Sequence, residues 1–517
     1  MDPESVYETY LTPMQEFYKQ SKVFVTGATG FLGRILVEKL LRACYVDTIY
    51  VMIREKKGKE MDVRLKELFD SVVFDRLRGE QPDFRGRIVG LYGDCAKPHL
   101  GIKEADREML IENVNFVFHC AATVNFDEKL HMATFINIRG TQEMLALARQ
   151  MRHLVFFTHV STAYAHCERK QLEEEFFEST YKARQLITIV EQLPEKTIDK
   201  IEPIILDEFP NTYAFTKTIS EQLIEEMDDF PIAMFRPAII VSTFKEPIPG
   251  WINNYYGPQG VTAGAMIGLL RTLQCDEKVD ANIVPVDMCA NGLLAIPWDA
   301  RKKYDEIVEF NKNAMEVDEH NLQRKKYKVP VYHFESNSTN PISWKRFREL
   351  TQSYGFDYLT VKMIGIYFFH LRKNYFTNWL ATIFMHYLPA IFYDLALLCT
   401  GSKPRMIQAY KKVHKFSSVI SYFCTQNWHY ESKNYIGLCD RMCEQDAALF
   451  LCDLRKLDWP TFFKTYLVGC RVYLIKDPIE TIPEAKRLYK KFALGTYCVL
   501  AFVFLLLAMM IYNMFKF

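Results

Sequence analysis

Residues 22–33 read KVFVTGATGFLG. An apolar segment of strand type comes first, and glycines follow it at positions 27, 30 and 33. A strand that leads through a glycine-rich turn into a helix is the setting of a dinucleotide-binding motif. The first glycine permits the tight turn, the second lets the backbone approach a pyrophosphate, and the third lets the helix pack closely on the sheet. The helix N-terminus then faces the phosphates. We expect cofactor contacts from Thr26, Gly27, Thr29, Gly30, Phe31, Leu32 and Gly33.

The sequence around this motif alternates short apolar segments with longer amphipathic stretches as far as about residue 241. We expect helices at 32–41 and 141–151 among others, and strands at 22–26, 48–53, 87–91, 116–119, 154–159 and 232–235. This alternation predicts an α/β fold of the Rossmann type, with a doubly wound parallel sheet.

Residues at other strand ends suggest which dinucleotide binds. Arg54 ends the second expected strand, where a cofactor without a 2′-phosphate usually meets an Asp or Glu. A cation suits a 2′-phosphate, so the sequence favours NADPH, and an exposed basic turn is the alternative. We expect Asp94 to lie near the adenine. The small residues that follow the strand at 116–119 would allow the backbone to approach the cofactor closely. The further expected contacts are Cys120, Ala121 and Ala122, and Arg236 and Pro237 beside the nicotinamide.

The candidate catalytic residues follow the strand at 154–159. Tyr213 and Lys217 have the spacing that places two side chains one turn apart on a helix face. A nearby ammonium favours the phenolate, so we expect a lowered pKa for Tyr213, which would give a proton to a carbonyl oxygen. Thr162, or Ser161, would donate a hydrogen bond to the same oxygen. Lys217 would also hold the nicotinamide ribose. A surface pair is the alternative for such a spacing alone.

Charge and cysteine usage narrow the class of protein. The 517 residues include 64 basic and 63 acidic side chains, a balance that predicts no nucleic-acid partner. The 13 cysteines are scattered without a C-x-x-C pair, so we expect no metal site and a reducing compartment.

The C-terminal region contains a long uncharged segment. Residues 492–514 could cross a hydrocarbon core of about 30 Å as a transmembrane tail anchor inserted after synthesis. A buried terminal helix is the alternative. Four basic residues precede the segment within seven positions, which predicts a cytosolic catalytic domain and a single pass. Residues 379–400 are also apolar, and Pro389 and Asp394 favour a helix that is buried or lies on the membrane face over one that spans it.

The domain organisation expected from these patterns is consecutive. We expect an N-terminal segment at 1–20, a Rossmann reductase domain at 21–300 and a connecting segment at 301–350 that returns to the sheet. A mainly helical domain at 351–480 and the tail anchor at 492–514 follow.

Several motifs together resemble those of eukaryotic fatty acyl-CoA reductases, the insect members above all. In the first half these are TGATGFLG at 26–33, HCAATV at 119–124, HVSTAY at 159–164, NTYAFTK at 211–217, EPIPGWI at 246–252 and IVPVD at 283–287. PAIFYD at 389–394 and GSKPRM at 401–406 resemble the helical C-terminal region of that family, the male-sterility domain. The spacing of three between the glycines resembles the extended short-chain dehydrogenases.

The resemblance implies a reaction. A long-chain acyl-CoA would be reduced by two NADPH, through an aldehyde, to a primary fatty alcohol, with release of CoA. Tyr213 and Lys217 would be the catalytic pair, with Thr162 or Ser161 as partner. Membrane lipid would be a further partner, a homodimer is possible, and the endoplasmic reticulum is favoured over the peroxisome. Two alternatives stay open: a membrane-bound steroid or sugar-nucleotide dehydrogenase, and a non-enzymatic membrane protein with a retained nucleotide-binding fold.

Overall fold

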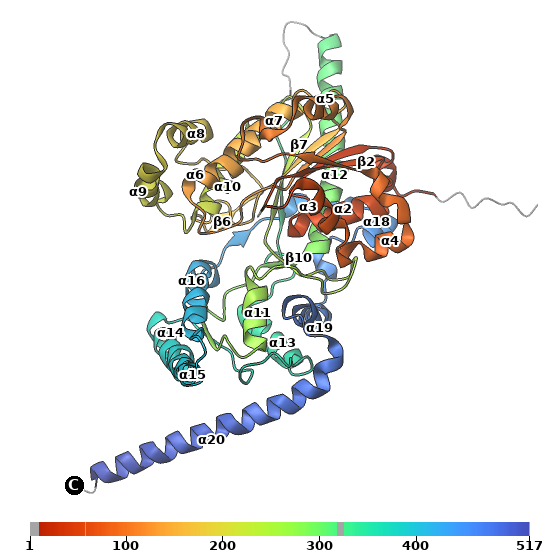
Figure 1. Cartoon of the computed structure of the whole chain (residues 1–517). Helices are drawn as coiled ribbons and strands as arrows, with labels where there is room; N and C mark the ends of the chain where they lie inside the picture. Colours follow the sequence, from red (N-terminus) through yellow and green to blue (C-terminus); the bar gives the residue numbers. More distant parts are fainter. Residues whose placement is uncertain (1–9, 57, 318–324, 516–517) are drawn as a thin grey trace, which may run out of the picture. The chain divides into compact units, whose positions relative to one another are not determined.

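The computed structural model describes residues 10–56, 58–317 and 325–515, and the chain in it divides into two compact units (Figure 1). Unit 1 is assembled from Met1–Ile248, Asn282–Pro341 and Trp428–Leu457. Unit 2 is assembled from Pro249–Ala281, Ile342–Asn427 and Asp458–Phe517.

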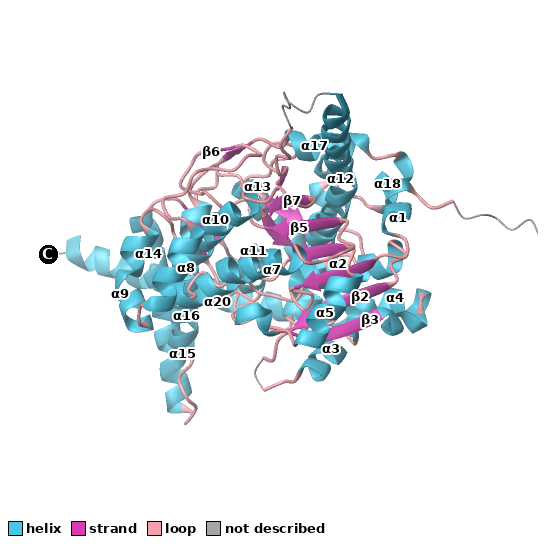
Figure 2. Cartoon of the chain, turned by 90° about the horizontal axis from the view of Figure 1, so that it is seen from above, coloured by secondary structure: helices cyan, strands magenta, loops and turns pink. Residues whose placement is uncertain are grey.

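Unit 1 is built on a seven-stranded parallel sheet in the order β11-β7-β5-β4-β1-β2-β3. The magenta strands β7, β5, β2 and β3 lie side by side in Figure 2. The parallel α/β fold expected from the sequence is confirmed. The strands are β1 (Lys22–Thr26), β2 (Thr48–Ile53), β3 (Ile88–Tyr92), β4 (Phe116–His119), β5 (Phe156–Val160), β7 (Ile232–Pro237) and β11 (Val331–Phe334).

The register of the sheet brings several strand ends to one edge. Thr26 of β1 pairs with Met52 of β2 and with His119 of β4, and His119 pairs with His159 of β5. In an open parallel sheet, ligands bind outside the carboxyl ends of the strands. The turns that follow β1, β2, β4 and β5 therefore share the edge at which a ligand is expected.

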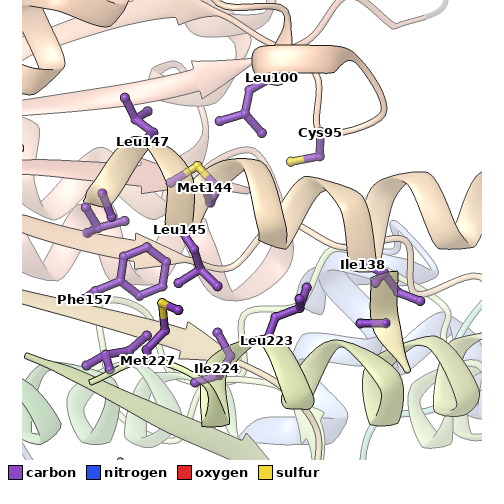
Figure 3. Close-up of a cluster of buried hydrophobic side chains, with 14 of the residues drawn as sticks. Cys95, Leu100, Ile138, Met144, Leu145, Leu147, Phe157, Leu223, Ile224 and Met227 are labelled. Atoms are coloured by element: carbon purple, nitrogen blue, oxygen red, sulfur yellow. The ribbon is translucent and has the colours of Figure 1, made fainter. Parts of the chain in front are cut away.

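Helices cover the sheet through apolar contacts. On one side, alternate strand residues such as Phe157 join Met144 and Leu145 of α7 (Gly140–Ala148) and Leu223 of α10 (Thr212–Glu225) in one buried cluster (Figure 3). Burial of such side chains contributes about 1.5–3 kcal/mol each relative to exposure. Two other helices, α2 (Phe31–Ala43) and α12 (Val286–Val317), pack against each other.

The last segment of unit 1 comes from late in the sequence. β13 (His429–Tyr430) pairs with β6 (Gln171–Leu172), and the Trp428 indole N–H donates to the Cys167 carbonyl oxygen at 2.9 Å. The helices α17 (Lys433–Arg441) and α18 (Glu444–Leu449) follow. The compact units thus interleave, whereas the ranges 21–300 and 351–480 expected from the sequence are consecutive. Residues 428–457 were assigned to the helical domain because their short elements carry no strand rhythm.

Unit 2 is mainly helical, as expected for the C-terminal region. A short pair of strands, β9 (Thr272–Gln274) and β12 (His370–Arg372), joins its first and second segments. Gly250 and Gly469 approach so closely that a Cβ on Gly469 would lie 1.6 Å from the Gly250 carbonyl oxygen. Its helices are α11 (Pro258–Met266), α13 (Trp344–Gly355), α14 (Tyr375–Thr382), α15 (Leu388–Cys399), α16 (Met406–Cys424), α19 (Trp459–Gly469) and α20 (Ile482–Phe515).

The remaining elements of unit 1 are short. A π-helical turn, η4 (Thr134–Arg139), lies between α6 (Leu130–Ala133) and α7. Four 3-10 turns are η1 (Val72–Phe74), η2 (Pro82–Arg87), η3 (Pro98–Gly101) and η6 (Leu454–Lys456). Further elements are α1 (Pro13–Tyr18), α3 (Met61–Phe69), α4 (Asp75–Glu80), α5 (Glu104–Asn113), α8 (Ala183–Gln192), α9 (Glu195–Leu206), β8 (Ile239–Val241) and β10 (Ile283–Pro285). Of the expected N-terminal segment, residues 1–9 lie outside the described residues.

Two helical stretches are long and apolar enough to cross a membrane, Tyr375–Cys399 and Ile479–Phe515. The expected anchor at 492–514 falls within α20, seen as the long blue helix in Figure 1. Its first turns pack on unit 2, where Ala485 lies against Leu359 and Met363. Beyond that, Phe502 and Met509 are more than 60% exposed. The alternative of a buried terminal helix is therefore wrong for the described residues of segment 492–514.

Candidate active site

The turn between β1 and α2 has the close packing that its glycines predict. Gly27 has a φ of 75°, and a Cβ there would lie 2.9 Å from the Ala121 backbone nitrogen. A Cβ on Gly33 would lie 2.2 Å from the Gly27 carbonyl oxygen, so α2 sits directly on the turn. Gly30 is the N-cap residue and brings no side chain to cap the helix. This end of α2 therefore offers backbone N–H groups to an anion.

The loop after β4 is held against the same turn. The Thr26 hydroxyl oxygen accepts from the Ala121 N–H at 3.2 Å and lies 2.8 Å from Nδ1 of His119. His119 is fully buried, and burial lowers its pKa to about 3, so its ring is neutral at physiological pH. The partly buried residues Cys120 and Ala121 consequently lie beside the glycine turn. The expected contacts of Cys120, Ala121 and Ala122 with the cofactor stay predictions.

A cluster of three guanidinium groups adjoins the turn. Arg34 Nε donates to the Thr29 carbonyl oxygen at 3.2 Å, and Arg64 donates to the Thr29 hydroxyl at 3.0 Å and to the Arg54 carbonyl oxygen. Burial, and then repulsion from a neighbouring guanidinium, lowers the pKa of both Arg34 and Arg64. Three like charges held together favour a bound anion. Arg54 was predicted here; Arg34 and Arg64 were not, because one lies inside a helix and the other on a separate helix, α3.

Asp94 lies in the turn after β3 and supports its own loop. Its carboxylate accepts from the Ala96 N–H at 3.0 Å, and its backbone N–H donates to the Leu100 carbonyl oxygen at 2.7 Å. The contact of Asp94 with an adenine stays a prediction.

Tyr213 and Lys217 project from α10 toward the end of β5. Asn211 caps this helix by accepting from the Ala214 N–H at 2.8 Å, which fixes where the helix starts. The Tyr213 side chain hydrogen-bonds that of Thr162. Lys217 is buried and its Nζ donates to the Val160 carbonyl oxygen at 2.6 Å. The structure thus places these three predicted residues together.

The acid–base properties differ from the expectation for Tyr213. Burial raises its pKa to about 12, and the bond with Thr162 offsets only part of this. The expected lowering of the pKa is not found, because burial dominates and Lys217 instead donates to a carbonyl oxygen. Burial also lowers the pKa of Lys217 to about 8, partly opposed by Glu221. At neutral pH the pair is therefore a neutral phenol beside an ammonium.

Ser161 and Arg236 meet a carboxylate that sequence reasoning missed. The Ser161 hydroxyl donates to Glu221 at 2.5 Å, and Arg236 donates to both oxygens of Glu221 at 3.0 and 2.5 Å. Burial raises the pKa of Glu221, but Arg236 and His166 outweigh it and hold that pKa well below its usual range. Ser161 is thus bonded away from Thr162 and Tyr213. The spacing of four from Tyr213 to Lys217 to Glu221 is the signal that could have found the carboxylate.

The guanidinium of Arg236 has its donors engaged inside unit 1. Besides Glu221, it donates to the carbonyl oxygens of Glu173 at 3.3 Å and Glu175 at 2.9 Å, and it lies 3.0 Å from His333 Nε2. A direct contact of this side chain with a cofactor therefore has no support in the structure. The neighbouring Pro237 carbonyl oxygen accepts from the Ala163 N–H at 2.9 Å.

Asn137 links the two sides of the site. It lies in the π-helical turn η4, and π-turns are frequent at functional sites. Its side chain accepts from the Thr123 N–H at 2.9 Å and donates to the Thr216 hydroxyl at 2.9 Å. The loop that follows β4 is thereby tied to α10. The same loop carries Phe126, whose ring stacks on that of Tyr213 with centroids 5.7 Å apart.

Known protein families match both halves of the chain. Residues 25–293 and residues 385–477 each match a family model described as "Male sterility protein". A fatty acyl-CoA reductase of Drosophila melanogaster, wat, is 38% identical over 98% of this chain and 94% of its own length. This chain belongs to the fatty acyl-CoA reductase family. The human fatty acyl-CoA reductase 1 is 34% identical to this reductase over 92% of this chain and 89% of its own.

Solved structures agree with the fold of this reductase. A reductase domain of a nonribosomal peptide synthetase from Mycobacterium tuberculosis superposes with a TM-score of 0.56 at 18% identity, covering 90% of this chain and 93% of its own. The terminal reductase domain of the myxalamid pathway gives a TM-score of 0.52 at 17% identity, covering 87% and 90%. These likenesses concern the fold alone. The family membership confirms the resemblance seen in the sequence motifs.

Proposed function

We propose that this protein reduces long-chain fatty acyl-CoA to the primary fatty alcohol with two NADPH, releasing CoA. The observation that carries the proposal is the hydrogen-bonded pair Tyr213–Thr162 at the strand edge that also holds the glycine turn. A hydrogen-bonded phenol and hydroxyl at this place suit the reduction of a carbonyl group. The family to which the chain belongs supports an acyl-CoA as the substrate.

The residues at the strand edge fit a nicotinamide dinucleotide. The uncapped start of α2 and its glycine turn would hold the pyrophosphate. Arg54, with Arg34 and Arg64 beside it, would hold a 2′-phosphate, which favours NADPH over NADH. When bound, the nicotinamide would supply a hydride to the carbonyl carbon in each of two rounds.

The protein's own side chains would donate the proton and stabilise the negative charge that develops on the carbonyl oxygen. Tyr213, protonated at neutral pH, would donate its proton to the carbonyl oxygen as that oxygen gains negative charge. Thr162 would donate a hydrogen bond to the same oxygen. Lys217 would stabilise the phenolate that Tyr213 leaves behind and would bind the ribose.

Two rounds at one site account for the alcohol. The first converts the thioester to a hemithioacetal, which breaks its C–S bond to release the CoA thiol and leave an aldehyde. The second reduces the aldehyde, with one hydride and one proton consumed in each round. Phe126, stacked on Tyr213, would limit the access of water to the reacting carbonyl between rounds.

The membrane anchor suits lipidic substrates and products. We infer that α20 inserts in the endoplasmic reticulum membrane, or in that of the peroxisome, with unit 1 in the cytosol. The exposed apolar side chains of α20 beyond Leu494 support insertion.

The test is product analysis with the purified full chain. With NADPH and palmitoyl- or stearoyl-CoA, we expect the C16 or C18 alcohol and two NADPH oxidised per alcohol. Tyr213→Phe should lower this rate at least about 100-fold, because it removes the acid while leaving NADPH binding intact.

Tyr304→Phe is the matched control, since Tyr304 lies on α12 beside Tyr327, near the start of β7. It should keep full activity. Turnover by Tyr213→Phe near the wild-type rate would remove the proposed acid. No NADPH oxidation with any long-chain acyl-CoA would overturn the proposed reaction.

A further inference from the structure

The helical stretch from α14 through α15 in unit 2 turns polar side chains inward and apolar side chains outward. Its buried face consists of Thr382, His386, Ala390 and Asp394, spaced by four residues and each less than 10% exposed. The outward face is apolar: Phe384, Leu388, Ile391, Phe392, Leu395 and Leu398 are 40–65% exposed. A surface helix in water shows the reverse arrangement.

The inward polar groups have defined partners, so this orientation is specified by the fold. His386 Nε2 accepts from the Arg271 backbone N–H at 2.9 Å, and its Nδ1 lies 3.1 Å from His414 Nε2 of α16. The Asp394 carboxylate accepts from the backbone N–H groups of residues 405, 406 and 407 at 2.9–3.0 Å. It thereby caps the N-terminus of α16. Turning the apolar face inward would break all of these bonds.

The surroundings of this apolar face are strongly basic. From residue 361 to residue 430 the sequence has eight Lys or Arg and a single acidic residue, Asp394, which is the buried cap. The whole chain, in contrast, has a net charge of only +1. Five of the basic residues directly follow α15 and are exposed: Lys403, Arg405, Lys411, Lys412 and Lys415. An apolar face with basic neighbours is typical of a helix that lies in a membrane interface.

We propose that the outward face of the π-helical turn η5 (Ile383–Tyr387) and of α15, defined by the six apolar residues above, lies in the surface layer of an anionic bilayer, parallel to its plane. The exposed basic residues then contact the phosphate and carboxylate groups of the lipid headgroups. Trp379, 46% exposed, and Tyr393, 42% exposed, suit the depth of the headgroups. The inference rests on the proposed anchor α20, which belongs to the same unit and brings it to the membrane.

A membrane span by this stretch is incompatible with its partner helix. The 25 residues of Tyr375–Cys399 are long enough to cross. However, the bonds from His386 to His414 and from Asp394 to residues 405–407 align α16 antiparallel to α15. Lys411 and Lys412 would then lie at the depth of the hydrocarbon core, where each charge costs about 2.5–3.5 kcal/mol. A second copy of the chain is also disfavoured as the occupant, because two faces with such basic neighbours repel each other.

The experiment uses the full chain in phosphatidylcholine vesicles, with and without phosphatidylserine, that contain a photoactivatable phospholipid. Peptide mass spectrometry then locates the lipid adducts. We expect adducts on 384–398 and on the apolar part of α20, and none at Ile204, an exposed apolar residue of α9. Adducts on α20 with 384–398 at the Ile204 level would overturn the inference while the anchor stands. Absence of adducts from α20 would instead count against the anchor.

Two sets of variants test the two parts of the surface. Phe392→Glu with Leu395→Glu should reduce the adducts on 384–398 about tenfold and leave those on α20 unchanged, and Ile204→Glu is the matched control. Phosphatidylserine should increase the adducts on 384–398 in the wild-type chain, and Lys411→Glu with Lys412→Glu should remove this increase. Equal labelling of all variants would overturn the inference. So would protection of Lys403 from a membrane-impermeant amine reagent, which indicates a span, or crosslinks between two copies through 384–398.

Discussion

A substitution of Arg54 would show whether this side chain favours NADPH over NADH. Its side chain is exposed at the end of β2, with Arg64 beside it bonded to its carbonyl oxygen. Arg54→Ala should raise the Kd for NADPH about 10- to 100-fold, since a hydrogen bond to a charged group contributes about 1.5–3 kcal/mol. The Kd for NADH should change little, because NADH has no 2′-phosphate. Fluorescence titration with both dinucleotides measures this.

The matched control is Arg76→Ala, which removes an exposed guanidinium of α4 that pairs with Glu80. It should change neither Kd. An equal loss for NADH and NADPH in Arg54→Ala would show that the side chain does not select the 2′-phosphate.

We expect Lys217 to set the alkaline limit of activity. Its pKa, lowered to about 8 by burial, means that the ammonium is present below this pH and lost above it. We therefore expect kcat/KM to fall about tenfold per pH unit above pH 8, since kcat/KM follows the ionisations of the free enzyme. The arginine in Lys217→Arg keeps its charge to higher pH, so this variant should not show the fall in kcat/KM above pH 8, whatever its overall rate. The same fall above pH 8 in Lys217→Arg would assign the ionisation to another group.

Sequence reasoning at the residue scale identified side chains with a recognised spacing and missed those selected by tertiary contacts. Tyr213 and Thr162 meet as predicted, and Lys217 bonds to the carbonyl oxygen of Val160, two residues before Thr162. Arg64 reaches Thr29 from a separate helix, and no spacing along the chain shows that. The pKa of Tyr213 could not be predicted either, because it depends on burial by neighbouring elements.

The junction of β1 with α2 is the element on which the cofactor site depends. In Gly33→Ala the new Cβ would lie 2.2 Å from the Gly27 carbonyl oxygen, a backbone atom, so α2 would have to shift. We expect at least a tenfold weaker affinity for NADPH and a loss of roughly 1–3 kcal/mol in the free energy of unfolding, as for overpacking. Dinucleotide titration and urea unfolding measure the two effects.

Gly79→Ala in α4 is the matched control for Gly33→Ala, because it adds the same methyl group at a position with free space. A Cβ there meets no atom within 4 Å, and alanine favours a helix by about 1 kcal/mol. This variant should bind NADPH normally and be slightly more stable. Normal NADPH binding by Gly33→Ala would mean that α2 moves without disturbing the site.

The elements most visible in the sequence were those of the parallel sheet. Buried strands such as Phe116–His119 and Ile232–Pro237 begin with three or four consecutive apolar residues, so their positions were predicted to within a few residues. β13 has only two residues, and its pairing with β6 depends on a return of the chain over more than 250 positions. No local pattern indicates such a pairing.

At the scale of the whole molecule, unit 1 needs its last segment. Asp446 accepts from the Met14 N–H at 3.2 Å, Lys39 donates to the Leu449 carbonyl oxygen at 2.6 Å, and Tyr430 donates to the Ala163 carbonyl oxygen at 3.0 Å. A chain ending at residue 427 would leave these buried groups unsatisfied. We expect it to aggregate on expression, as judged by size-exclusion chromatography.

A chain ending at residue 491 is the matched control. It loses the apolar part of α20, which is mostly exposed apart from Phe492 beside the cluster of Leu359, Met363 and Ala485, so it should be folded and bind NADPH. Soluble, NADPH-binding protein from the 427-residue chain would show that segment 428–457 is dispensable for unit 1.

The interleaving of the units also orders events on the ribosome. The backbone passes from one unit to the other after residues 248, 281, 341, 427 and 457. At a synthesis rate of about 5–20 residues per second, the nascent sheet waits several seconds between residue 341 and the segment that begins at residue 428. During that interval the surfaces that Trp428 and Tyr430 will cover are open to water. We therefore expect the nascent chain to bind chaperones that recognise apolar surface until translation has passed residue 457.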